Sequence, residues 1–407
     1  MCILFLTDNF PPEVNAPATR TFEHSKEWVK MGHEVTVITS APNFPFGRVF
    51  SGFKNSWIDK RKEEGIEVWR VKTYIAANEG VIKRTIDYLS FMISSFIFGL
   101  GKKDIDVIIG TSPQFFTVLS AWALSKIKKV PFIFELRDLW PESIAALGAV
   151  KNKWLLSFLE KIELFLYKES SLIITVTQSF KNNLIERGIK SNKIKVIPNG
   201  ADTSKLFPGK RHDTELSSEF NIKNEFIAGY IGTHGMAHGI DSIVEAAVYL
   251  QKYPEIRILL AGSGSERERI EYEIKNKQIK NIILIPQQPK EKIRELWSLC
   301  DISIIHLKNL PIFKTVIPSK IFESIAMEIP LVISIPRGEA TQIVLENKIG
   351  IVVEPENSEE LANAIIKMKK DNDMRLLYSK NCRESIKKYN REELAKNYIK
   401  YISTIVE

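Results

Sequence analysis

The sequence has little of what defines several protein classes. Its 407 residues include only Cys2, Cys300 and Cys382, whose odd number and wide spacing argue against a disulfide framework or a CxxC metal site. No apolar run reaches the roughly 20 residues that a membrane-spanning helix needs. An HExxH motif, a P-loop, zinc-finger spacing and an RNA-binding aromatic signature are all missing. We therefore expect no bound metal and no nucleic-acid partner.

Two further features point the same way. Residues Met1 to Leu6 are apolar, but they lack a basic start and run directly into Thr7-Asp8-Asn9, which indicates a buried strand and not a signal peptide. A cytoplasmic protein is the expectation. Asp104-Ile105-Asp106 has the form of a metal-binding DxD, but Asp106 begins a predicted strand and so lies at the wrong end of a sheet.

Positive charge is in excess, with 57 Lys and Arg against 49 Asp and Glu. This excess suits an anionic membrane surface or a phosphorylated ligand, although composition alone also explains it. Residues 88–101 (YLSFMISSFIFGLG) lie between the basic pairs 83–84 and 102–103. Such flanks are typical of a helix lying on an anionic bilayer, and a core helix of the first domain explains the same pattern.

Short apolar runs alternate with helix-length segments along the whole chain, as in α/β proteins with doubly wound parallel sheets. The predicted strands are Cys2–Leu6, Val35–Thr39, Ile66–Val71, Asp106–Gly110, Phe132–Leu136, Leu172–Val176, Ile194–Pro198, Phe226–Gly232, Ile256–Ala261, Ile282–Ile285, Ile302–His306, Leu331–Ile335 and Gly350–Val353. Their number predicts two Rossmann-like domains that face each other across a cleft, with ligands at the carboxyl ends of the strands.

The domain boundary is expected after Pro198-Asn199-Gly200 and before the polar stretch 210–224. Residues 1–200 then form the first domain and residues 201–387 the second, with a helical tail at the end of the chain.

Glycine-rich turns follow two strands of the second domain. Gly232, Thr233, Gly235 and His238 precede a helix predicted over Ile240–Tyr253, whose amino end suits a phosphate. Gly262 and Gly264 follow the next strand and allow a ligand to lie against the backbone. Ordinary strand–helix turns explain both patterns equally well.

A charged pair opens a later helix in Pro318-Ser319-Lys320-Ile321-Phe322-Glu323. Ser319 is the expected N-cap, and Lys320 and Glu323 share one helix face in the first turn. An ammonium there can neutralise a diphosphate, and a carboxylate can accept both hydroxyls of a ribose. The alternative is a solvent-exposed salt bridge, which stabilises by only about 0.3–0.5 kcal/mol.

The first domain has two candidate segments. Arg137, Asp138 and Trp140 follow a predicted strand, where they form either a substrate site or a buried ion pair that steadies a loop. The proline-rich loop after the first strand contains Pro12, Asn15, Ala16 and Arg20. It either shapes an acceptor site or simply covers the sheet edge.

Several segments together resemble the family 4 glycosyltransferases of the GT-B fold, in the family's order across almost the whole chain. These segments are residues 33–38, 196–202, 232–241, 260–264 and 318–330. Asp138-Leu139-Trp140-Pro141 and Pro318-Ser319-Lys320 resemble a bacterial subgroup that makes capsule, O-antigen and exopolysaccharide and includes L-fucosamine transferases.

The resemblance implies a retaining, metal-independent enzyme with a nucleoside-diphosphate sugar as substrate and no cofactor. It implies that residues 388–407 pack back on the first domain. Donor contacts are expected from the second-domain residues named above, with Gln287 and Lys290 near the base, and catalytic contributions from Asp138, Lys320 and Glu323. Acceptor contacts are expected from Arg137, Trp140 and the proline-rich loop.

Two departures from the family pattern matter. The family has two glutamates separated by seven residues; Glu323 matches the second, but Thr315 stands at the first. The family also often has Arg and Lys in the loop after the first strand of the second domain, where Thr233 and His238 stand here. Lys320 is therefore expected to meet the diphosphate charge. The predicted function is sugar transfer to a glycan, polyprenyl-diphosphate-linked in our expectation, by a cytoplasmic or peripheral membrane enzyme. The alternatives are a nucleotide-sugar 2-epimerase and a non-catalytic, membrane-associated nucleotide-binding protein.

Overall fold

The computed structural model describes residues 1–44, 47–76, 81–141, 152–209 and 215–406. The chain divides into two compact units, each described by itself below. Unit 1 contains Met1–Asn199 and Arg391–Glu407, and unit 2 contains Gly200–Asn390. The sequence predicted that the chain leaves the first domain after residue 200 and returns to it at residue 388. Of the polar stretch expected between the domains, residues 210–214 lie outside the described part of the chain.

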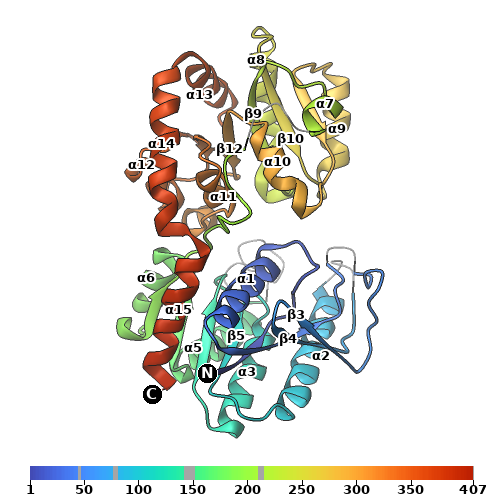
Figure 1. Ribbon diagram of the computed structural model, residues 1–407, viewed down its shortest axis with the longest axis vertical. Helices are drawn as coiled ribbons and strands as arrows, with labels where there is room; N and C mark the ends of the chain where they lie inside the picture. Colours follow the sequence, from blue (N-terminus) through green and yellow to red (C-terminus); the bar gives the residue numbers. More distant parts are fainter. Residues whose placement is uncertain (45–46, 77–80, 142–151, 210–214, 407) are drawn as a thin grey trace. The chain divides into compact units, whose positions relative to one another are not determined.

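In the described residues, the sheet of unit 1 has eight strands in the order β3-β4-β2-β1-β5-β6-β7-β8 (Figure 1). The strands are β1 (Cys2–Leu6), β2 (Glu34–Ser40), β3 (Ile58–Glu63), β4 (Ile66–Val71), β5 (Val107–Thr111), β6 (Phe132–Leu136), β7 (Leu172–Thr175) and β8 (Ile194–Val196). All neighbours pair in parallel except β3 and β4, which form an antiparallel hairpin.

Two helical layers cover this sheet. Ile3 and Phe5 of β1 belong to the core under α1 and α15, whereas Leu4 and Leu6 belong to the core under α2, α3 and α5. This period of two is the expected consequence of strand geometry. The helices of unit 1 are α1 (Ala16–Lys30), α2 (Val81–Leu100), α3 (Phe115–Lys128), α5 (Lys153–Glu169), α6 (Gln178–Glu186), the short η1 (Ser191–Lys193) and α15 (Arg391–Val406).

The last helix of the chain, α15, packs on α1 within unit 1. The Trp28 indole nitrogen donates to the carbonyl oxygen of Ala395 at 3.1 Å, and the Trp28 and Tyr398 rings meet edge to face at 5.1 Å. Both aromatic side chains are fully buried. The tail is therefore part of the core of unit 1.

All but the last residue of the apolar segment at 88–101 lies within α2. Phe91, Ser95 and Gly99 pack inward, and Gly99 leaves room for the side chain of Leu124 on α3. Ile93 and Ile97 on the opposite side are exposed. One face of α2 thus packs in the core of unit 1, as the interpretation of this segment as a core helix requires. Within the described part of the chain, no helix is both long and apolar enough to span a bilayer.

In unit 2 the described residues form a parallel sheet in the order β11-β10-β9-β12-β13-β14. The strands are β9 (Phe226–Ile231), β10 (Ile256–Ala261), β11 (Ile282–Ile285), β12 (Ile302–His306), β13 (Leu331–Ser334) and β14 (Gly350–Val353). The strand order reverses direction between β9 and β12. In open α/β sheets, ligands bind at such a switch point, beyond the carboxyl ends of the strands.

The helices of unit 2 surround this sheet (Figure 1). They are α7 (Glu215–Glu219), η2 (Met236–His238), α8 (Ile240–Leu250), α9 (Arg267–Asn276), η3 (Lys290–Lys292), α10 (Ile293–Ser298), η4 (Pro311–Thr315), α11 (Lys320–Ala326), α12 (Glu339–Glu346), α13 (Ser358–Lys370) and α14 (Asn372–Tyr389). Together with unit 1, these elements establish the predicted α/β class and its two doubly wound sheets.

Candidate functional site

The loop after β9 lies at the switch point of unit 2. It passes through Gly232, the short helix η2 and Gly239 before α8 begins at Ile240. Gly239 has φ 54° and ψ 43°, and a Cβ there would meet the imidazole of His306 at the end of β12. The glycine therefore brings the loop after β9 against the strand on the other side of the switch point.

Gly262 and Gly264 have a structural explanation. Their φ values are 142° and 155°, and Cβ atoms added there would collide with the carbonyl oxygens of Gly232 and His234. The backbone amide of His234 also donates to the carbonyl oxygen of Ser263 at 2.8 Å. What lies against these two glycines in the structure is thus the loop after β9, and direct ligand contact with them stays a prediction.

Gly262→Ala is expected to lower the free energy of unfolding by about 1–3 kcal/mol, because its φ suits only glycine and the new methyl group would strike backbone. Gly235→Ala is the matched control in the same pair of loops. Gly235 has an extended backbone with φ −108°, and a Cβ there would meet only ordinary contacts at 3.4 and 3.7 Å. Urea unfolding of both variants measures the difference, and equal stabilities would contradict it.

Lys320, the first residue of α11, reaches the loop after β9. Its Nζ lies 3.7 Å from the centroid of the Tyr230 ring, and its Cε occupies the space beside Gly232 that a Cβ would fill. Burial lowers the pKa of the Lys320 ammonium to about 7. An incoming anion would restore the charge of this group, because it would replace the hydration that the side chain has lost.

The histidines beside Lys320 are neutral. Burial, and secondarily the ammonium of Lys320, lower the pKa of His238 to about 3. The carbonyl oxygen of His238 lies 2.7 Å from Nδ1 of His306. The buried Nδ1 of His238 has no hydrogen-bond partner among the described residues. His238 can therefore offer a hydrogen bond at this edge, but it brings no positive charge at neutral pH.

Glu323 lies one turn after Lys320 in α11. The indole nitrogen of Trp297 donates to Oε2 of Glu323 at 3.3 Å. Burial raises the pKa of the Glu323 carboxyl, and this bond and the charges of Lys320 and Lys290 oppose the rise. In the described residues no ion pair joins Lys320 to Glu323, and both side chains are half-buried. The surface salt bridge considered as an alternative is not formed.

The other predicted donor residues lie along the same edge. Ser263 donates from its hydroxyl to Oε1 of Gln287 at 2.5 Å, which links the loops after β10 and β11. Thr315 donates to the carbonyl oxygen of Ile312 at 3.0 Å. Pro318 and Ser319 lead into α11, but Ser319 has α-helical backbone angles and its side chain forms no cap bond. Ser319 is therefore the N-cap residue by position, as predicted, but without the side-chain hydrogen bond that usually accompanies this position.

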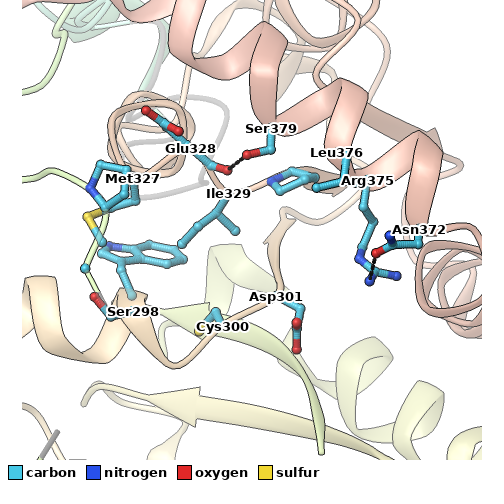
Figure 2. Close-up of a pocket in the computed structure, with 14 residues that line it drawn as sticks. Ser298, Cys300, Asp301, Met327, Glu328, Ile329, Asn372, Arg375, Leu376 and Ser379 are labelled. Atoms are coloured by element: carbon cyan, nitrogen blue, oxygen red, sulfur yellow. Dashed lines mark hydrogen bonds between the residues drawn. The ribbon is translucent and has the colours of Figure 1, made fainter. Parts of the chain in front are cut away.

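A pocket of about 260 Å³ lies at the opposite edge of this sheet. Figure 2 shows Cys300 and Asp301, which directly precede β12, and Ile329, which precedes β13, on its walls. The pocket is therefore not the candidate site. Trp297 lines this pocket and also donates to Glu323, so its side chain connects the pocket to the candidate site.

In unit 1, Arg137, Asp138 and Trp140 follow β6. The backbone amides of Arg137 and Asp138 donate to the hydroxyl of Ser112 at 2.8 and 3.3 Å, and Trp140 stacks on Phe115 with centroids 4.6 Å apart. Nε and Nη1 of Arg137 are buried and have no hydrogen-bond partner in the described residues. Burial lowers the pKa of this guanidinium to about 10. Arg137 is thus a cation that a ligand could satisfy.

The loop after β1 presents a mixed picture. Pro12 and Ala16 are exposed, and Asn15 caps α1 by accepting from the backbone amide of Ala18 at 2.9 Å. Arg20 is fully buried and binds Glu135 at 3.0 Å as well as the carbonyl oxygens of Ile197 and Pro198. The side chain of Arg20 is therefore held inside unit 1, and its acceptor role stays a prediction.

Two residues at these sites had no predicted role. Trp297 lies in no recognisable motif, so its bond to Glu323 appears only in three dimensions. Asp8 directly follows β1, and burial raises the pKa of its carboxyl well above the usual range. The Asp8 carboxylate accepts from the side-chain amide of Gln114. Its place after a strand end was the signal that could have identified it.

Two family models match the chain over nearly its whole length. The model described as Glycosyltransferase Family 4 matches residues 18–205, and the model described as Glycosyl transferases group 1 matches residues 213–391. These two models identify a glycosyltransferase, and its two Rossmann-like units are those of the GT-B fold. The chain belongs to the family 4 glycosyltransferases.

Individual relatives agree with this assignment. WcaI of Escherichia coli K12, a putative colanic acid biosynthesis glycosyl transferase, is 25% identical over 90% of this chain and 91% of its own length. Sucrose-phosphate synthase from Thermosynechococcus elongatus superposes with a TM-score of 0.78 at 16% identity, covering 99% of this chain and 98% of its own. HepE from Anabaena, in complex with UDP, gives 0.74 at 17% identity and covers 99% and 100%. These structural likenesses describe the fold.

Proposed function

We propose that this enzyme transfers a hexosyl or N-acetylhexosaminyl group from a nucleoside-diphosphate sugar to a glycan acceptor, with retention at the anomeric carbon and without a metal or cofactor. One observation carries the proposal: Lys320 and Glu323 lie three positions apart on one turn of α11, beside the glycine-rich loop after β9. A cation and a carboxylate so placed complement the diphosphate and the ribose of one nucleotide.

The donor contacts divide by chemistry. Glu323 accepts the two ribose hydroxyls, and the base lies toward Gln287 and Lys290. The diphosphate lies between Lys320, the neutral imidazole of His238 and the backbone amides around Gly235. The low local polarity that lowers the pKa of Lys320 also strengthens its attraction for an anion. Thr315 lies where the family has its first glutamate, so a contact to the sugar or its phosphate is lost or supplied from elsewhere.

The transfer step breaks the bond between the anomeric carbon and the diphosphate oxygen. Both bonding electrons leave with the diphosphate, and Lys320 stabilises the charge that develops there; one such group is typically worth about 2.7–4 kcal/mol. The acceptor hydroxyl bonds to the anomeric carbon on the same face. Its proton passes to the departing phosphate oxygen, so the products are the glycoside and the nucleoside diphosphate.

The acceptor belongs to unit 1 in this proposal. Asp138 orients the sugar and the acceptor, and the unsatisfied Arg137 guanidinium meets an anionic group of the acceptor. Trp140, Pro12, Asn15 and Ala16 surround this region. A polyprenyl-diphosphate-linked glycan would satisfy Arg137. WcaI is named for the biosynthesis of a bacterial surface polysaccharide, which supports the same class of product for this chain.

A thermal-shift screen against UDP-, GDP- and dTDP-sugars, followed by transfer to a polyprenyl-diphosphate sugar, tests the proposal. Glycoside formed with its anomeric configuration retained is the expected result. Conversion of the donor without acceptor would instead identify a 2-epimerase, and binding without turnover a non-catalytic nucleotide-binding protein.

Trp297→Phe is expected to raise the donor KM about tenfold with little change in kcat, because a hydrogen bond to a charged group contributes about 1.5–3 kcal/mol. The variant keeps an aromatic ring in the core, but it loses the N–H that holds Glu323 and part of the indole volume as well. A 2′-deoxyribose donor is the control, since it cannot use the full carboxylate contact. If Trp297→Phe raises the KM of that donor by as large a factor, Trp297 does not act through Glu323.

A further inference from the structure

The outer face of α5 carries large apolar side chains that are exposed, although Phe165 at one end also meets the ring of Trp122 edge to face at 5.2 Å. Trp154, Phe158 and Phe165 are 88%, 59% and 42% exposed. With Lys161 they occupy positions i, i+4, i+7 and i+11, so they form one stripe along the helix. The buried side chains of α5, among them Leu159 and Leu166, lie on the opposite side. This stripe therefore faces away from the sheet.

Helix α2 repeats this pattern in the same layer. Ile93 and Ile97 are 53% and 56% exposed, and they lie opposite the buried Phe91 and Ser95. Helix α3 contacts both α2 and α5, so the three helices form one layer over one face of the sheet (Figure 1). We call the exposed side chains of Ile93, Ile97, Trp154, Leu155, Phe158 and Phe165 the apolar face.

Basic side chains accompany this apolar face. Lys161 lies within the stripe of α5, and Lys153 and Lys168 are exposed near its two ends. Among the described residues, no carboxylate forms an ion pair with Lys153 or Lys161. The exposed carboxylate of α5, that of Glu160, lies 3.4 Å from Arg187. Unpaired positive charge thus surrounds aromatic groups that water solvates poorly.

We propose that this apolar face docks on an anionic lipid bilayer, with Trp154 and Phe158 entering the interface and Lys153 and Lys161 meeting the headgroups. Aromatic side chains on one face of a helix with lysines beside them are the features that hold a helix at a membrane surface. The inference rests on the proposed function for one point, the lipid-linked acceptor. Beyond that function, the inference identifies α5 as the main contact with the bilayer and the apolar face as the surface that turns toward the membrane.

Co-sedimentation of the full-length protein with vesicles tests this proposal. We expect binding to an equimolar mixture of phosphatidylcholine and phosphatidylglycerol and little binding to phosphatidylcholine alone. Trp154→Ser/Phe158→Ser should weaken binding at least tenfold, and Lys153→Gln/Lys161→Gln should weaken it by about fivefold per lysine. The control, Leu376→Ser/Leu377→Ser, removes two other exposed apolar side chains, from α14, and should bind as the wild type does.

Brominated lipids provide a readout of depth. They should quench the fluorescence of the wild type more than that of Trp154→Phe, because Trp154 enters the bilayer. All the substituted side chains are exposed, so the thermal midpoints should match that of the wild type.

Three results would overturn the proposal. The first is no binding of the wild type to anionic vesicles, and the second is undiminished binding by Trp154→Ser/Phe158→Ser. The third is a wild-type dimer in solution that this variant converts to a monomer, which would make the face a contact between copies of the chain. Transfer to a water-soluble acceptor should remain normal in these variants. A failure of membrane binding is therefore distinguishable from a failure of the proposed reaction.

Discussion

Glu323→Gln should lower kcat/KM for the donor by about a hundredfold or more while the fold stays intact. The carboxylate has two acceptor oxygens for the two ribose hydroxyls, whereas the carboxamide has one, and each hydrogen bond to a charged group contributes about 1.5–3 kcal/mol. Steady-state kinetics with the donor found in the screen measures this effect.

The control for this prediction is Glu268→Gln. Glu268 is also a carboxylate in the first turn of a helix of unit 2, α9, but it is exposed and lies in no candidate site. Its replacement should leave the kinetics unchanged. Near-normal turnover by Glu323→Gln, with an unaltered thermal midpoint, would remove Glu323 from the donor site.

Lys320→Ala should cost about a hundredfold to a thousandfold in kcat, the usual loss when one charge-stabilising group is removed. The pKa of about 7 in the free enzyme adds a pH dependence. Below this pKa the ammonium is already present, so donor affinity is constant. Above it the side chain must gain a proton on binding, and the Kd should rise about tenfold per pH unit.

Calorimetry from about pH 6 to about pH 9 tests this sign, because the donor diphosphate is esterified at both ends and has no proton to lose there. Proton uptake on binding should increase with pH in the wild type. Lys320→Arg keeps a permanent charge and should bind with no pH dependence in this range. The exposed Lys314→Ala should behave as the wild type does. Constant wild-type affinity together with zero proton uptake would show that Lys320 does not meet the diphosphate.

The parallel strands were predictable because strands buried on both faces are continuous apolar runs, and each predicted run overlaps an observed strand. Strand β3 was not predicted. Its sequence, IDKRKE, is dominated by charge, and it is an antiparallel edge strand that pairs only with β4. Helix α1 starts at Ala16, within the segment expected to be a proline-rich loop, because Asn15 caps it and Pro17 fits its first turn.

The candidate site was predictable to the extent that its glycine-rich loops directly follow strands and its charged pair opens a helix. The sequence placed Lys320 and Glu323 on one turn, and it could not show that Lys320 lies over Tyr230 or that Trp297 holds Glu323. Those contacts join residues that are distant along the chain. Arg20 is the clearest case: its proline-rich surroundings suggested a surface loop, while its partner Glu135 is 115 positions away.

Helix α15 has a consequence for how this chain folds during synthesis. Trp28 is buried against Ala395 and Tyr398, so the core of unit 1 is incomplete until α15 has left the ribosome. Unit 2 is one continuous stretch, Gly200–Asn390, and all of it is synthesised before α15. The second unit along the sequence is thus the first able to finish folding. Residues 1–199 must wait for α15 before the helical layer that α1 begins is complete.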